Sequence, residues 1–508
     1  MTSAMVGTAI KYLLLVLGII LTYEIVRAIL VSSLKGKLNR SVKEFIEKNR
    51  IRLDKYKFMH KVVVKHELMN DPDIHEEIIA HAKEKNLTIF EVEGNVEKYI
   101  DEIVPAFNLL SYYKIGYWVA NFILNLIYEV VIDRENAEKL KRIPENSVIV
   151  FVMNHRSNID YILVAFMLAR QISLSYAVGE WARVWPLEYI FKSFGAYFIR
   201  RRFREKLYHL VLEKYVQLIS IQGVTQGIFI EGGLSRDGNF RQTKTGILNY
   251  IIGVHNDPRF DRELVFVPAA INYDWILEDR SLIQEWKVGK ETSGFGDHLA
   301  SLARIVGKGP FLLFVNFFRY LSGRLKHHGY ASVSFGDPLF FSDFLKGEKE
   351  DIFTLERYDR LARIQELADR LLLRIGKAMP VTPVGLVSQA LLSFDRENVS
   401  LNELIAKVSS MRDELKKMNA RIVLGRVFEG SMESFSRLKN EEDNRRRELV
   451  SFEEDFLASQ EVGDTVRTAV SLLKRRKIIS LKKGEVKINA KRAVLLEFYS
   501  NSLSQLIS

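Results

Sequence analysis

The sequence predicts an α/β fold, with helices flanking a central sheet and additional helical regions toward both ends of the chain. Between about residues 146 and 340, short apolar runs alternate with longer runs of helical periodicity, which is the pattern of strands and helices in turn. One run, SVIVFVM at 147–153, is apolar from Val148 onward and is typical of a strand. A chain of 508 residues has room for about three domains.

The expected elements follow from these runs in chain order. Apolar residues spaced three and four apart place one stripe of each intervening helix against the sheet. The stripe after the first strand is Ile159, Ile162, Leu163, Phe166 and Met167, and the helix after the third strand carries Leu207, Leu210, Val211, Leu218 and Ile219. We expect strands at 147–153, 172–178, 196–199, 227–230, 264–271 and 332–335.

The first 33 residues contain an uncharged apolar run at 12–23 (YLLLVLGIILTY), bracketed by Lys11 and Glu24. A spanning helix needs about 20 apolar residues, so spanning would place Lys11 in the hydrocarbon at a cost of a few kcal/mol. We expect a membrane anchor over 1–33, monotopic or marginally spanning, with a buried amphipathic helix as the alternative. If it spans, the positive-inside rule leaves the following chain in the cytoplasm, because basic residues come next: Arg27, Lys35, Lys37 and Arg40.

Two further regions are expected to be helical. The N-terminal helical region, 34–140, contains a hydrophobic segment at 112–130 with several aromatic residues at its start. This pattern favours contact with a membrane interface, and the alternative is a core helix. The C-terminal helical region, 381–508, contains a small basic hairpin centred on Lys483-Gly484 that resembles a winged module. Such hairpins sometimes bind nucleic acid. More often they are solvated or touch anionic lipid, so no nucleic-acid partner is expected.

Composition limits the chemistry. There are 74 Lys and Arg against 63 Asp and Glu, a net charge of +11, which attracts an anionic partner such as an acidic membrane or a phosphorylated substrate. The absence of cysteine excludes disulfides, thiolate metal sites and a thiol nucleophile. No HExxH, Walker loop or GxSxG elbow is present, so we expect no metal and no cofactor. A histidine base would have to activate the substrate's own hydroxyl.

The first expected strand runs directly into NHRSNID at 154–160. His155 would lie at the carboxyl end of that strand, where open α/β sheets bind ligands. Asp160 begins the next helix, so a turn can fold its carboxylate back to a ring nitrogen of His155. Spacing alone is weak evidence, because His66 and Asp71 have the same spacing in a polar stretch. The alternative is a histidine that satisfies loop backbone groups.

Three other segments carry polar groups at strand ends. In GAYFIRRR, at 195–202, a strand ends in three arginines, which clamp phosphate with paired hydrogen bonds or else are merely solvated. In FIEGGLSRDG, at 229–238, glycines after a strand let backbone N–H groups approach an anion, the alternative being a tight turn. VPAAINYDWILE, at 267–278, is a buried strand that opens onto a polar tip.

Together and in this order, the four segments resemble the motifs of the membrane-bound glycerol-3-phosphate acyltransferase family, the HxxxxD acyltransferases. The likeness continues through 244–246 (KTG), 335–338 (FGDP) and 381–384 (VTPV), and spans roughly residues 145–392. It implies a glycerolipid acyltransferase-like fold, α/β with a central mixed sheet flanked by helices, and an acyltransferase domain over 141–380.

The resemblance also implies roles for individual residues. His155 would be the general base and Asp160 its orienting carboxylate, while Pro268 would lie on the acyl-donor side. The family's third motif usually has arginine where this chain has Leu234, so a phosphate contact is lost or comes from Arg202, Arg241 or Lys244. The glycerol phosphate would be bound by Arg201, Glu231, Gly232, Gly233, Ser235 and Arg236, with Arg200, Arg202 and Lys244 as further candidates.

The implied reaction transfers a fatty acyl group from acyl-CoA or acyl carrier protein to the sn-1 hydroxyl of glycerol 3-phosphate. The product would be 1-acyl-glycerol 3-phosphate, lysophosphatidic acid, the first intermediate of phospholipid synthesis. We expect a membrane-associated protein that contacts the lipid surface, with its site on the cytoplasmic side (of the inner or plasma membrane in a bacterium). Two rivals stay open: acylation of dihydroxyacetone phosphate or a lysophospholipid, and an inert basic scaffold that binds membrane or nucleic acid.

Overall fold

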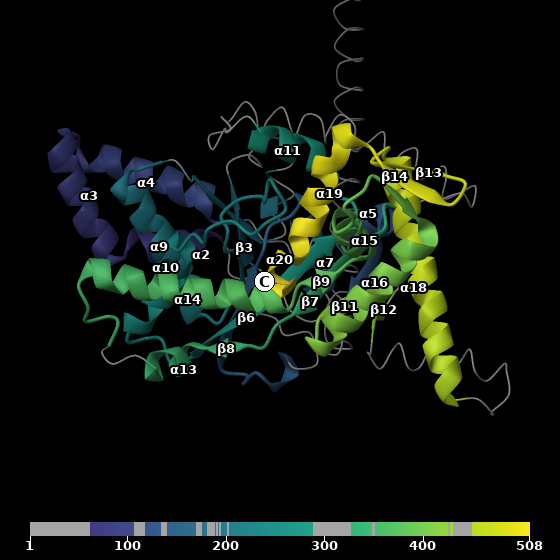
Figure 1. Cartoon of the computed structure of the whole chain (residues 1–508). Coiled ribbons are helices and arrows are strands. Elements are labelled where there is room, and N and C mark those ends of the chain that lie inside the picture. The colour runs from purple at the N-terminus through teal and green to yellow at the C-terminus, as the bar shows by residue number, and fades with distance from the viewer. Residues whose placement is uncertain are drawn as a thin grey trace, which may run out of the picture.

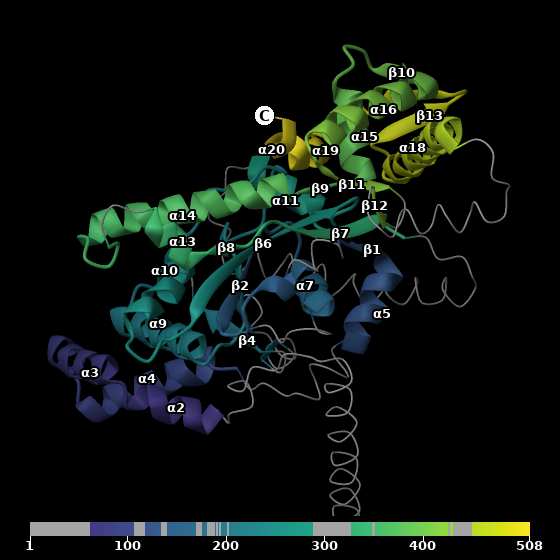
Figure 2. The same cartoon turned by 90° about the horizontal axis from the view of Figure 1, so that it is seen from below.

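A mixed sheet forms the middle of the molecule, between N-terminal helices at one end and C-terminal elements at the other (Figures 1 and 2). The expected anchor at 1–33 lies outside the residues that this computed structural model describes. The described residues are 61–105, 117–133, 140–168, 175–179, 188, 191–192, 195–200, 203–287, 327–347, 351–424, 427–429 and 450–507.

Eight described strands make up the sheet, in the order β1-β7-β6-β2-β5-β3-β4, with β8 paired to β6. Strands β6, β2, β5, β3 and β4 are parallel, whereas β7 and β8 run antiparallel to β6, and β1 is parallel to β7. The expected mixed sheet is therefore confirmed. The bounds are β1 (Glu129–Ile132), β2 (Ser147–Met153), β3 (Ser175–Gly179), β4 (Ala196–Ile199), β5 (Gln226–Phe229), β6 (Glu263–Tyr273), β7 (Tyr330–Phe335) and β8 (Leu339–Phe340).

Helices cover both faces of this sheet, which explains why β2 is apolar from Val148 to Met153. Val148, Val150 and Val152 belong to one buried cluster, while Ile149 and Phe151 face another. The first face is covered by α4 (Ile89–Ile103), α9 (Lys206–Ile221), α10 (Gly246–Gly253), α13 (Phe341–Lys346) and α14 (Arg357–Lys377). The second is covered by α5 (Tyr117–Ile127), α7 (Asp160–Leu168), α11 (Asp279–Lys287) and α15 (Pro383–Leu392).

The N-terminal helices begin at residues that cap them. Helix α2 (Lys61–Met69) is followed by α3 (Pro72–Lys85), whose first turn is capped by the Asp71 side chain. Thr88 and Glu91 form a capping box at the start of α4. Within the described part of the chain, no helix is both long and apolar enough to cross a membrane.

We define the C-terminal module as β10 (Asn398–Ser400), α16 (Leu401–Lys417), α18 (Val450–Arg475), β13 (Ile479–Lys482) and β14 (Glu485–Ile488), which form a three-stranded sheet with its helices. The expected hairpin is present: Lys483 and Gly484 both have positive φ, as a two-residue hairpin turn requires. The chain continues through α19 (Ala493–Ser500) and α20 (Ser504–Ile507). A smaller sheet joins β9 (Pro380–Val381), β11 (Arg421–Leu424) and β12 (Val427–Phe428).

Differences from the expected elements are local. β2 and β4 have the predicted bounds, and the other predicted strands are shifted or extended by one to three residues. Strand β1 was not expected, because its four residues EVVI merge with the apolar end of α5. The sheet therefore already includes residue 129, and Leu124 and Ile127 of the preceding helix are buried in the core.

Candidate active site

Four segments with polar groups meet at one edge of the sheet. Since β2, β4, β5 and β6 are parallel, their carboxyl ends point the same way, and Met153 at the end of β2 is paired with both Phe229 of β5 and Ala269 of β6. Each of these strands runs into one of the polar segments singled out in the sequence. This is the edge at which α/β sheets place their ligands.

His155 and Asp160 form a hydrogen-bonded pair at this edge. Nδ1 of His155 lies 2.9 Å from Oδ2 of Asp160, so the expected turn back from the start of α7 is present. Because a carboxylate only accepts, Nδ1 of the neutral ring carries the hydrogen and Nε2 carries the lone pair. The pair thus has the tautomer that a general base requires.

The Asp160 carboxylate is held by three further donors. Oδ2 accepts from the backbone N–H groups of Arg156 (2.7 Å) and Ser157 (3.0 Å), and Oδ1 accepts from the hydroxyl of Tyr273 (2.7 Å). Asp160 is fully buried, so these donors replace the water that an ionised carboxylate loses on burial. They leave the carboxylate one orientation, toward the ring.

Aromatic side chains fix the plane of the His155 ring. It stacks on Phe229 with ring centroids 4.2 Å apart, and Tyr161 meets it edge-on at 5.3 Å. The residue is only 3% exposed. Phe229 and Tyr161 also contact each other, with centroids 4.8 Å apart, so this aromatic cluster restricts rotation of the His155 ring, which suits a group whose proton must move along a defined direction.

Glu231 joins the His155 segment to the loop after β5. Its carboxylate accepts from the backbone N–H groups of His155 (2.9 Å) and Arg241 (2.7 Å), while the His155 carbonyl accepts from the Ser235 N–H (2.9 Å). Burial raises the pKa of Glu231 to about 7, although both N–H groups favour its ionised form. Here Glu231 binds backbone and holds the two loops together.

A second buried carboxylate, Glu278, holds the same loop from the other side. It accepts from the Ser157 hydroxyl (2.9 Å) and from the Asn158 N–H (3.1 Å), and burial raises its pKa. The side-chain amide of Asn154 continues the hydrogen bonding between β2 and β6 beyond the end of β2. It donates to the carbonyl of Ile271 and accepts from the Ile271 N–H. The loop at 154–160 is therefore anchored to three neighbouring segments.

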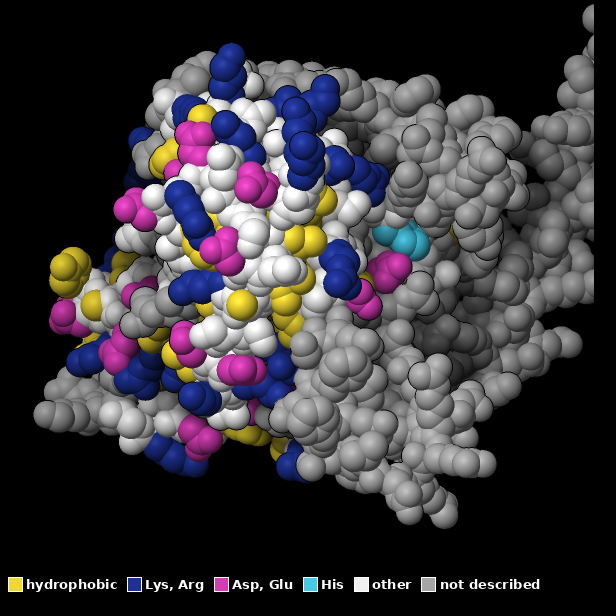
Figure 3. Space-filling model, turned by 45° about the vertical axis from the view of Figure 1, so that its right-hand side comes forward, with side chains coloured by type: hydrophobic (Ala, Val, Ile, Leu, Met, Phe, Trp, Pro, Cys, Tyr) yellow, Lys and Arg dark blue, Asp and Glu magenta, His cyan; other side chains and the backbone are white. Residues whose placement is uncertain are grey.

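Several expected phosphate contacts have partners within the protein. Arg200 makes a two-pronged ion pair with Glu102 of α4, and Arg236 lies 3.3 Å from Glu285 of α11. On the face drawn in Figure 3, Lys and Arg side chains are spread out with Asp and Glu side chains among them. Arg201 and Arg202 lie outside the described residues.

The loop after β5 is a tight turn. Gly232 has a φ of 63°, and a Cβ there would lie 2.8 Å from the Cγ of Lys244, whose side chain is exposed beside the turn. The Ser235 hydroxyl donates to the Asn239 carbonyl and accepts from the Gly238 N–H. Gly233 is buried in this loop.

Two other singled-out residues are apolar. Leu234 is partly buried against the core, so its side chain adds no charge to this edge. Pro268 lies within β6, and its carbonyl accepts from the Gly336 N–H at the break between β7 and β8. A central strand tolerates this proline because the neighbouring strand is interrupted there.

His66 and Asp71 have the same sequence spacing as His155 and Asp160, but each bonds to a different partner. The His66 ring contacts the Asn70 side chain, and Asp71 caps α3 through the N–H groups of Asp73 and Ile74. Position at a sheet edge, and not spacing, separates the two cases.

Comparison with known proteins finds similar sequences over much of the chain. Residues 131–272 match the family model described as acyltransferase, and residues 314–424 match the model of the glycerol-3-phosphate acyltransferase C-terminal region. Glycerol-3-phosphate acyltransferases of Haemophilus influenzae (26% identical over 391 residues) and Aeromonas hydrophila (28% over 361 residues) align with 75% and 69% of this chain. Over the matched residues, the chain is therefore similar to acyltransferases and, in particular, to glycerol-3-phosphate acyltransferases.

The chain spans less than half the length of these two relatives, 45% and 42% respectively. Among solved structures, it is similar to the 1-acyl-sn-glycerophosphate acyltransferase of Thermotoga maritima, at 16% identity. That match covers 51% of this chain and 80% of the other, with a TM-score of 0.27.

Tyr273, Glu278 and Asn154 support the His155–Asp160 pair but were not identified from the sequence. All three lie inside the singled-out segments, but their partners depend on the order of strands in the sheet. In the described part of the chain, His, Asp and Glu side chains form no group able to hold a metal ion.

Proposed function

We propose that this protein transfers a fatty acyl group from acyl-CoA or acyl carrier protein to the sn-1 hydroxyl of glycerol 3-phosphate, giving 1-acyl-glycerol 3-phosphate. The His155–Asp160 pair carries the proposal, because it is an oriented base at the edge where four family motifs converge. The names of the relatives support the acceptor.

The mechanism is a single displacement. As the acceptor oxygen attacks the thioester carbonyl carbon, its proton passes to Nε2 of His155, and Asp160 stabilises the imidazolium that forms. When the C–S bond breaks, the imidazolium returns the proton to the leaving sulfur, so the products are the ester and a free thiol. Tyr273 and the N–H groups of Arg156 and Ser157 keep Asp160 in place throughout.

For the acceptor phosphate we propose Arg201, Gly232, Gly233, Ser235 and Arg236. Arg236 would exchange Glu285 for the phosphate, since a dianion competes well for a guanidinium. Additional contacts come from Arg202 and from Lys244, whose exposed side chain lies over Gly232. In this proposal Glu231 shapes the site from beneath, and Pro268 belongs to the acyl-donor side.

The test is a direct assay. Detergent-solubilised protein is incubated with labelled glycerol 3-phosphate and palmitoyl-CoA, and labelled lysophosphatidic acid and free CoA thiol are measured. A parallel arm uses palmitoyl acyl carrier protein. Equal amounts of both products, absent in the His155→Ala variant, are expected; no thiol release by folded protein would refute the proposal and favour an inert scaffold.

One observation favours a second acceptor. Leu234 packs on the core where the family motif carries arginine, so phosphate recognition differs here. Competition among glycerol 3-phosphate, dihydroxyacetone phosphate and a lysophospholipid therefore decides the acceptor. If either rival has the higher kcat/KM, the acceptor assignment fails while the acyl-transfer chemistry stands.

We further propose that the enzyme acts at the cytoplasmic face of a membrane, where its acyl product partitions into lipid. The apolar run at 12–23 and the net charge of +11 support this. Flotation with vesicles containing anionic lipid tests it: the full chain should float, and a variant lacking residues 1–33 should float less.

A further inference from the structure

Arg476 connects the C-terminal module to the segment that follows β6. It comes directly after α18 and is 4% exposed, and its guanidinium pairs with Asp279 at the start of α11, 197 residues earlier in the chain. Its Nη1 also donates to the hydroxyl of Tyr499 in α19 (2.7 Å). The Trp275 ring lies beneath the guanidinium, with its centroid 4.6 Å from the Cζ atom.

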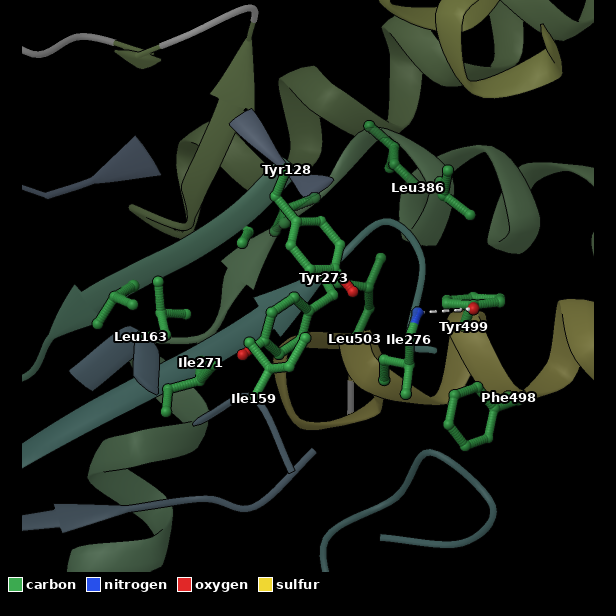
Figure 4. Close-up of a cluster of buried hydrophobic side chains, with 14 of the residues drawn as sticks. Tyr128, Ile159, Leu163, Ile271, Tyr273, Ile276, Leu386, Phe498, Tyr499 and Leu503 are labelled. Carbon is green, nitrogen blue, oxygen red and sulfur yellow. Dashed lines mark hydrogen bonds between the residues drawn. The ribbon is translucent and has the colours of Figure 1, made fainter. Parts of the chain in front are cut away.

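Tyr499 completes this contact. Its hydroxyl donates to Oδ2 of Asp279 (2.5 Å) and accepts from the backbone N–H of Ile276 (3.1 Å), the bond drawn as a dashed line in Figure 4. The hydroxyl thus has one acceptor and two donors, including Arg476, and its hydrogen-bonding capacity is filled. Three points of the 275–279 segment are fixed by residues 476 and 499.

The same segment supports the candidate active site on its opposite side. Glu278 holds the Ser157 hydroxyl and the Asn158 N–H, two residues before Asp160. Just before the segment, Tyr273 holds Oδ1 of Asp160, and Figure 4 shows its ring beside that of Tyr128, whose hydroxyl donates to the Trp275 carbonyl. The segment therefore lies between the C-terminal module and the His155–Asp160 pair.

A buried ion pair is a costly way to obtain stability. Removing two charges from water offsets much of their attraction, and apolar side chains of similar volume often stabilise a protein as well or better. In addition, the ion pair fixes the relative orientation of the two segments that it joins, because guanidinium and carboxylate groups bond only in particular geometries. The partners of Arg476 lie in the 275–279 segment, so the fixed geometry of the ion pair positions that segment.

We propose that Arg476 is a positioning residue for acyl transfer: with Tyr499 it fixes the 275–279 segment, which in turn holds the loop carrying His155 and Asp160. The inference rests on the proposed function. It assigns the C-terminal module a part in the chemistry, although none of its described residues has a hydrogen bond or ion pair with His155 or Asp160.

The test compares Arg476→Met with a matched control, Arg412→Met. Arg412 is also buried in the C-terminal module and pairs with Glu429, but in the described structure it has no hydrogen bond or ion pair with the 275–279 segment. Each variant leaves one carboxylate with a remaining partner, Tyr499 in the first case and Lys416 in the second. We therefore expect the two variants to lose a similar amount of stability. Only Arg476→Met loses a contact with the 275–279 segment.

Two readouts separate positioning from general destabilisation. In Arg476→Met, kcat should fall at least tenfold with acceptor KM within about twofold, while Arg412→Met keeps its kcat. Hydrogen–deuterium exchange of residues 154–162 should accelerate in Arg476→Met only, because the Asn158 N–H and the Ser157 hydroxyl lose their fixed partner, Glu278. Equal kcat and equal exchange in the two folded variants would overturn the inference.

A milder variant covers the case in which Arg476→Met does not fold. Tyr499→Phe keeps the ion pair but removes the hydroxyl that links Asp279 to Ile276, so the same two changes are expected at smaller size. Wild-type levels of both would overturn the inference. If the wild-type protein transfers no acyl group, the proposed function fails, and exchange at 154–162 alone decides whether Arg476 holds the loop.

Discussion

The hydroxyl of Tyr273 donates a 2.7 Å hydrogen bond to Oδ1 of Asp160, joining the end of β6 to the start of α7 across 113 residues of sequence. The carboxylate that orients His155 is thus oriented by a residue on a neighbouring strand. Precision at the candidate site depends on the sheet, which is rigid, more than on the loop that carries it.

Removing that hydroxyl is expected to slow turnover more than it weakens the fold. Tyr273→Phe should lower kcat roughly five- to tenfold and cost about 1 kcal/mol of stability, the usual value of one buried hydrogen bond. Steady-state kinetics and thermal unfolding measure the two effects. The matched control is Tyr197→Phe, because the buried Tyr197 hydroxyl has no hydrogen-bond partner in the described structure. Equal kcat values for the two variants would contradict the role of Tyr273.

Replacing His155 should abolish catalysis, whereas replacing His66 should not. A general base contributes about 10²- to 10⁴-fold, so we expect His155→Ala to lose at least a hundredfold in kcat. His66→Ala, at the same spacing from an aspartate, should retain wild-type turnover because Asp71 caps a helix. Asp160→Asn should fall between them. Substantial turnover by His155→Ala would show that another group takes the proton.

Stability should fall as pH rises through the titration of Glu231. Its pKa is raised from 4.5 in the unfolded chain to about 7 in the folded protein, so the folded state binds the proton more tightly. The resulting stability is fully present below pH 4.5 and is lost as pH rises to 7, by about 3 kcal/mol. Glu231→Gln does not titrate, so its melting temperature should decline less between pH 5 and 8. Parallel pH curves for the two proteins would exclude a buried, titrating Glu231.

A methyl group at Gly238 is expected to push α19 away from the loop after β5. Gly238 has a φ of 93°, and a Cβ there would lie 2.0 Å from the Phe498 carbonyl oxygen, which belongs to the α19 backbone. Gly238→Ala should therefore cost about 3 kcal/mol or more, against about 1 kcal/mol of backbone strain alone for Gly484→Ala, where φ is 80° and the space is open. Unfolding in denaturant compares the two. Equal losses would mean that α19 moves aside freely.

The parts of the fold predicted from sequence are those in which local pattern and burial agree. β2 was predicted to the residue because burial on both faces leaves a continuous apolar run. β1 was missed because its residues merge with the apolar end of α5, and β10 was missed because three residues are too few to show a period. The hairpin at Lys483-Gly484 was predicted from its turn residues.

The contacts of the candidate site also divide into those that local sequence predicts and those that depend on the tertiary structure. The contact between His155 and Asp160 depends on one short turn and could be predicted from spacing and position. The contacts of Tyr273 and Glu278 depend on which strands are neighbours, and nothing local in the sequence encodes strand order. Glu231 was expected to bind the substrate. In the structure, both of its carboxylate oxygens accept hydrogen bonds from backbone N–H groups, because these are the nearest donors to a carboxylate that lies between two loops.

The seating of residue 501 on the loop after β5 has a consequence for biogenesis. Asn501 donates to the Asp237 carbonyl, 264 residues earlier in the chain. At about 5 to 20 residues per second, a ribosome needs roughly 13 to 53 s to make that interval. During that time the nascent chain already contains His155 and Asp160 but lacks this contact, so the loop after β5 gains its support from residue 501 only when synthesis is nearly complete.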